Sequence, residues 1–65
     1  MKFHEILRQR RLALGLTQEQ LAQRLGVSAP AVNKWERNNS YPDITLLPPL
    51  ARLLEVDLNT LLSFQ

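Results

Sequence analysis

Cysteine is absent from this chain of 65 residues, and histidine occurs once, as His4. Without cysteine the chain forms no disulfide and lacks the cysteine spacings that hold structural zinc. One histidine does not make a metal site alone. We therefore expect no metal and no other cofactor. The absence of cysteine also fits the reducing cytoplasm, which we take as the expected location.

Long apolar runs are missing as well. A membrane-spanning helix needs about 20 consecutive apolar residues, and a signal peptide needs a basic start followed by an apolar stretch. Neither pattern occurs, so we expect no membrane partner. The chain is also short, and a domain of this size buries only about 60% of its unfolded surface. We expect one domain over residues 1–65 with one small core.

The net charge of +2 is weakly basic, which permits a nucleic-acid partner without requiring one. The distribution of charge is more informative. Between Gln20 and Trp35 the chain has two basic residues, Arg24 and Lys34, and no acidic residue. A surface formed by this segment would suit a polyanion.

Leucine recurs at helical spacing and no strand-like alternation occurs, which predicts an all-α fold of five short helices. The first is expected over residues 3–14, ending at Gly15. The second follows the capping box of Thr17 and Gln20 and ends at Gly26. The third is expected from Ser28, a good cap, to Arg37.

The last two helices have weaker signals. Asp43 is positioned to cap a short turn, and Pro48-Pro49 place the start of the fourth helix near Leu47, since two prolines fit a helix start but not its middle. That helix is expected to end near Leu54. Asp57 should cap a last short helix, whose apolar residues are Leu58, Leu61, Leu62 and Phe64.

The second and third helices are joined only by Gly26-Val27, which predicts a compact, angled helix-turn-helix. Val32 and Trp35 fall on the inner side of the third helix. The spacing of Trp35 from Val32 favours the core over stacking on a base. The outer side is expected to carry Ala29, Pro30, Asn33, Lys34 and Arg37.

Residues 16–28 have the sequence LTQEQLAQRLGVS, followed by Val32, Trp35-Glu36-Arg37 and Pro42. This pattern closely resembles the Cro/repressor-type helix-turn-helix domains, also called xenobiotic-response-element-like. Arg11 and residues 53–56 fit it too, so the resemblance covers nearly the whole chain. It implies a phage-repressor-like bundle of five helices and a recognition helix over 28–37. It also implies no catalysis and, usually, dimeric binding to operator DNA.

The resemblance also implies roles for single residues. The glutamine matching Gln18 bonds a DNA phosphate in this family, and its place at a helix start suits an anion. In this family, the residues at the positions of Arg11 and Glu36 form a partly buried ion pair between the first and third helices. We expect both residues to be structural, and Gln18 to contact phosphate rather than only water.

Base contacts are expected from the start and outer side of the third helix. Asn33 suits adenine, while Lys34 suits guanine or a phosphate. Ala29 and Pro30 are able to touch a thymine methyl group but donate no hydrogen bond, where family members often carry long polar side chains. We therefore expect loose sequence specificity. The full set of expected base contacts is Ser28, Ala29, Pro30, Asn33 and Lys34.

Phosphate contacts are expected just beyond the third helix, from Arg37, Asn39 and Tyr41. Asn38-Asn39-Ser40 is also ordinary turn chemistry, so the loop has a structural reading beside the functional one.

The function predicted from these features is sequence-specific binding of double-stranded DNA by a transcriptional regulator, with repression the commoner outcome in the family. The alternative is a protein-interaction or antitoxin-type module that uses the apolar C-terminal helix. Two further hypotheses stay open: a homodimer on a palindromic operator, and a chain that is the DNA-binding fragment of a longer regulator. No grouping of nucleophile and base is visible, so we expect no enzymatic activity.

Overall fold

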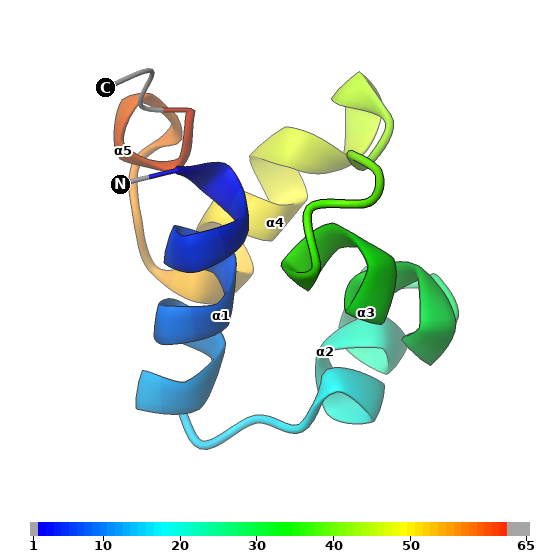
Figure 1. The fold of residues 1–65 in the computed structure, drawn as a ribbon. Coiled ribbons are helices and arrows are strands. Elements are labelled where there is room, and N and C mark those ends of the chain that lie inside the picture. The colour runs from blue at the N-terminus through cyan, green and yellow to red at the C-terminus, as the bar shows by residue number, and fades with distance from the viewer. Residues whose placement is uncertain (1, 63–65) are drawn as a thin grey trace.

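The computed structural model describes residues 2–62, and within that range the chain is all-helical, with five α-helices and one 3-10 turn. The helices enclose one core, with α1 facing the α2–α3 pair and α4 crossing between them (Figure 1). This confirms the predicted fold class. The elements are α1 (Phe3–Ala13), α2 (Gln18–Leu25), α3 (Ala29–Glu36), η1 (Ile44–Leu46), α4 (Leu47–Leu54) and α5 (Leu58–Leu61).

The helix starts follow the capping residues that the sequence predicted. The Gln20 amide donates to Thr17 Oγ1 at 3.0 Å, and the Thr17 amide donates to Gln20 Oε1 at 2.9 Å. This completes the capping box of α2. Ser28 Oγ accepts from the Ala31 amide at 3.3 Å, and Asp57 Oδ1 accepts from the Thr60 amide at 2.6 Å.

Four helix ends turn through a residue with a left-handed backbone: Gly15 after α1, Gly26 after α2, Asn38 after α3 and Glu55 after α4. After α2 the chain turns at Gly26, with φ of 81°, a conformation that glycine adopts without strain. After α4 the same turn falls on Glu55, with φ of 59°. An L-residue other than asparagine or aspartate adopts this conformation at a cost of about 1–2 kcal/mol.

Replacing Glu55 with glycine is therefore expected to stabilise the domain. Relief of the strained φ outweighs the extra backbone entropy of glycine, and we expect a net gain of about 0.5–1 kcal/mol in the free energy of unfolding. Urea denaturation monitored by circular dichroism measures it. Glu55→Ala removes the carboxylate but keeps the Cβ, so an equal gain in that variant would mean that strain is not the cause.

The core is built from all five helices. Leu7, Leu21, Val32, Leu50 and Leu54 are among the side chains with no solvent exposure. Trp35 is buried among them, as predicted, and so is not free to stack on a base. The core residues are Phe3, Ile6, Leu7, Leu16, Leu21, Ala22, Val32, Trp35, Leu50, Ala51, Leu54 and Leu61.

The C-terminal helix leaves less apolar surface than the sequence predicted. Leu61 is fully buried and Leu62 is half-buried, while Leu58 is 40% exposed. Phe64, which was expected to extend this apolar face, lies outside the described residues. The surface that suggested a protein-interaction module is therefore reduced, within residues 2–62, to Leu58 and the exposed part of Leu62.

Arg10 links the first and fourth helices in a way that the sequence did not reveal. Its Nε donates to the backbone oxygen of Leu54 at 2.9 Å, at the end of α4. Carbonyl groups at a helix end lack partners within the helix, so a cation there is favourable. The contact spans 44 residues and depends on tertiary packing.

Within the described range, no helix has the length and apolar character needed to cross a membrane.

Candidate nucleic-acid interface

The helices α2 and α3 form one rigid unit around a very short turn. The backbone amides of Gly26 and Val27 both donate to the Ala22 oxygen, each at 2.9 Å. Ser28 then caps α3 at once, so the second helix starts at a fixed angle to the first. Val32 and Trp35 anchor α3 to the core and leave its opposite side facing solvent.

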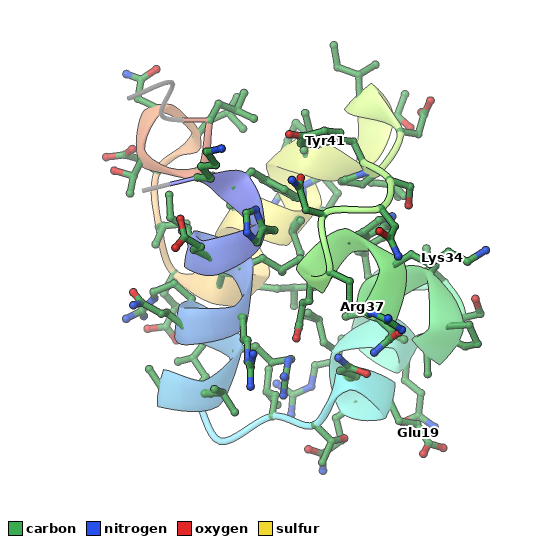
Figure 2. All side chains as sticks on the ribbon, viewed as in Figure 1. Glu19, Lys34, Arg37 and Tyr41 are labelled. Carbon is green, nitrogen blue, oxygen red and sulfur yellow. The ribbon has the colours of Figure 1, made fainter. Side chains whose placement is uncertain are left out.

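The solvent-facing side of α3 and the loop after it carry two cations. Lys34 and Arg37 are both exposed, as is Pro30. Figure 2 shows Lys34 extending from α3 away from α1, with Arg37 on the same half of the molecule. An exposed acid, Glu19, lies lower on this half, at the start of α2 (Figure 2).

Ala29 differs from its predicted position on the outer side of α3. It is half-buried and packs against the core. Ser28 is exposed, and its hydroxyl oxygen accepts the Ala31 amide in capping α3. Among the five predicted base contacts, Pro30 and Lys34 are therefore the freely exposed side chains of α3 itself.

A buried ion pair lies directly behind α3, as the family resemblance implied. Arg11 Nε contacts Glu36 Oε2 at 2.5 Å, and Arg11 Nη2 donates to Glu36 Oε1 at 2.9 Å. Arg11 Nη1 also donates to the Leu16 oxygen at 2.8 Å. The hydrogen bond to Glu36 raises the pKa of Arg11 above its ordinary value, so the guanidinium stays charged. This pair joins α1, the loop before α2, and α3.

Gln18 connects this pair to the outer surface. Its Nε2 donates to Glu36 Oε1 at 3.1 Å, and its Oε1 accepts from Asn33 Nδ2 at 3.3 Å. A continuous series of hydrogen bonds thus runs from Arg11 through Glu36 and Gln18 to Asn33. Both amide side chains are half-buried rather than extended into solvent. The sequence placed each residue near the interface but gave no signal for the bond between them.

Tyr41 lies in the loop that follows α3 (Figure 2). Its ring centroid is 5.5 Å from that of Phe3, with the planes tilted by 41°. The side chain is still 69% exposed, so the ring fastens the loop to α1 while much of its surface remains accessible. Arg37 and Asn39 are also exposed in this segment.

Among residues 2–62, no group of three or more His, Cys, Asp or Glu side chains is placed to hold a metal ion.

Comparison with known proteins identifies a helix-turn-helix family and relatives that belong to it. A family model described as helix-turn-helix matches residues 7–61. The HTH-type transcriptional activator BcrR of Enterococcus faecalis is 43% identical over 63 residues, which is 97% of this chain and 31% of that protein. The chain therefore spans about a third of this relative's length.

Two solved structures extend the comparison to the fold. The P22 c2 repressor, in a complex with a synthetic operator, has a TM-score of 0.92 at 31% identity, covering 100% of this chain and 98% of that one. The restriction-modification controller protein C.AhdI of Aeromonas hydrophila has a TM-score of 0.81 at 32% identity, covering 91% and 86%.

Proposed function

Because the chain belongs to the Cro/repressor-type helix-turn-helix family, we propose that it binds double-stranded DNA sequence-specifically, as the DNA-binding part of a transcriptional regulator. The proposal rests on the outer side of α3, which faces solvent, carries a basic residue and is held against α2 by a very short turn. A helix presented in this way fits the major groove, where its first residues meet base edges. The P22 relative is itself bound to an operator.

Base contacts are assigned to α3. Lys34 is the exposed cation of the helix and suits guanine or a phosphate, while Asn33 suits adenine. Pro30 offers an apolar surface to a thymine methyl group. Ser28 and the half-buried Ala29 lie at the helix start, where they come close to the groove but add little hydrogen bonding. Sequence preference should therefore be concentrated at the bases facing Asn33 and Lys34.

Phosphate contacts are assigned to both ends of the helix pair. Arg37, Asn39 and Tyr41 are exposed after α3 and supply a cation, an amide and a phenol. On the other side, Gln18 is the first residue of α2, where backbone amides lack partners within the helix and attract an anion. These contacts fix the position of the domain on the duplex without selecting a sequence.

We further propose that two copies bind a palindromic operator, since two-fold sites match a pair of identical domains. The regulatory outcome differs among the relatives, one being named an activator and another a repressor. We propose repression for this chain, by occupation of a promoter, which a reporter gene placed behind the selected operator would test. Increased expression would contradict it.

Selection from a pool of random duplexes, repeated at two salt concentrations, tests the main proposal. We expect an enriched site of two inverted half-sites, with centres about 34–36 Å apart. The logarithm of the binding constant should fall with the logarithm of salt concentration, with a slope of about −0.9 for each phosphate contacted. Absence of an enriched site together with absence of salt dependence would refute DNA binding.

A further inference from the structure

The hydrogen bonds around Gln18 fix the orientation of two side-chain amides, those of Gln18 and Asn33. Glu36 carries a carboxylate, which only accepts hydrogen bonds when ionised, and it already receives Arg11. The end of Gln18 that meets this carboxylate must therefore be the donor, Nε2, as observed at 3.1 Å. Rotating the Gln18 amide by half a turn would bring its oxygen against the carboxylate.

The orientation is passed on to Asn33. With Nε2 committed to Glu36, Gln18 presents Oε1 toward α3, and an acceptor there requires a donor from its neighbour. Asn33 supplies Nδ2 at 3.3 Å. The asparagine oxygen Oδ1 and the second hydrogen on Nδ2 are thereby left for a ligand. Because Nδ2 is held by Gln18, the acceptor and the donor of this amide do not exchange places.

We propose that Gln18 is a positioning residue that fixes the Asn33 amide to recognise adenine and to reject guanine. This inference rests on the proposed function. Adenine offers an N6 donor and an N7 acceptor in the major groove, which match the Oδ1 and Nδ2 of asparagine. Guanine has the acceptor O6 in place of the N6 donor. A fixed Oδ1 opposes O6 with a second oxygen, whereas a freely rotating amide would turn and donate to it.

The buried pair consequently acts on specificity as well as on stability. The charge on Glu36, held by Arg11, sets Gln18, and Gln18 sets Asn33. A role for Gln18 limited to phosphate binding predicts something different, because its loss would then weaken binding to every sequence by the same factor. The ratio of affinities for adenine and guanine separates the two roles.

The experiment starts from the duplex selected for the wild-type chain and replaces each base pair in turn. Fluorescence anisotropy gives the dissociation constants for wild type, Asn33→Ala and Gln18→Ala. The matched control is Gln23→Ala, an exposed glutamine on the same helix. Asn33→Ala should abolish an adenine preference at one position of each half-site. Gln18→Ala should lower the preference for adenine over guanine at that same position by about tenfold, since a bidentate contact gives roughly 5- to 150-fold discrimination.

Gln18→Met provides a second variant of similar length and without an amide, so a folding defect in Gln18→Ala does not end the test. Thermal melts confirm that each variant is folded. An equal loss of affinity for all duplexes in both Gln18 variants would overturn the positioning role, as would an Asn33→Ala variant with unchanged base preferences. An absence of any selected site for the wild-type chain would instead contradict the proposed function.

Discussion

Replacing Glu36 with alanine is expected to lower the free energy of unfolding by about 3–5 kcal/mol, because it leaves the Arg11 guanidinium buried without its partner. Arg11 makes two contacts to Glu36 and a third to the Leu16 oxygen, and both charged side chains are at most 10% exposed. Total stabilities of small domains are about 5–15 kcal/mol, so this one change removes a large share. DNA binding should weaken through loss of folded protein, and the protein that remains folded should also show a reduced preference for adenine over guanine, because the carboxylate that orients Gln18 is gone.

Urea denaturation of the wild type, Glu36→Ala and Glu19→Ala measures the effect. Glu19 is an exposed acid on α2, and its removal should change stability by less than about 0.5 kcal/mol. An unchanged free energy of unfolding in Glu36→Ala would show that the ion pair does not support the fold.

Replacing both partners by apolar residues separates stability from specificity. A buried ion pair exchanged for well-packed apolar side chains is often neutral or stabilising. Arg11→Met combined with Glu36→Leu should therefore recover most of the stability lost in Glu36→Ala. It also removes the carboxylate that orients Gln18, so the recovered protein should bind DNA with reduced preference for adenine over guanine. Stability and base preference recovered together would show that the orientation of Gln18 does not depend on Glu36.

The pH dependence of the pair follows from the raised pKa of Arg11. A cation whose folded pKa exceeds its unfolded value contributes stability that is complete below the unfolded pKa and is lost as the pH rises through the folded pKa, and for arginine both lie in strong alkali. The pair's contribution through Arg11 should therefore be constant from pH 7 to about pH 10. A loss of stability over that interval, absent in the apolar double variant, would contradict this assignment.

Local chemistry made much of the fold predictable from the sequence. The capping box at Thr17, the cap at Ser28 and the glycine at Gly26 are each determined by residues within a few positions, and each appears where expected. The same holds for the proline pair that starts α4. Such signals act through the backbone nearby and do not depend on how helices cross.

Features that depend on the crossing of helices were not predictable in the same way. The Gln18–Asn33 bond and the Arg10 contact with Leu54 join residues that are 15 and 44 positions apart. Ala29 falls on the outer side of an isolated helix, but in the folded domain it packs partly against the core. The Arg11–Glu36 pair was anticipated because the family pattern includes it, not because spacing alone requires it.

Reversing the charge of Lys34 is the change expected to affect DNA binding most. Lys34 is the exposed cation on α3, and Figure 2 shows it extending away from the body of the domain. Glutamate at this position would lose a base or phosphate contact and would face the dense negative charge of the duplex. We expect the affinity for the selected operator to fall by about 100-fold or more at low salt, as the sum of a lost contact and a new repulsion. The fold should be unaffected, since the side chain is exposed.

The matched control for Lys34→Glu is Arg8→Glu, which reverses an exposed cation on α1, an element assigned no DNA contact. Both variants remove the formal net charge of +2, so long-range attraction to DNA falls by a similar amount in each. A loss of DNA affinity that occurs only in Lys34→Glu would therefore be due to the position of Lys34 on the interface and not to the change in total charge. Equal losses in the two variants would mean that the chain binds DNA through its overall charge, and an unaffected Lys34→Glu would exclude the outer side of α3 as the DNA-contacting surface.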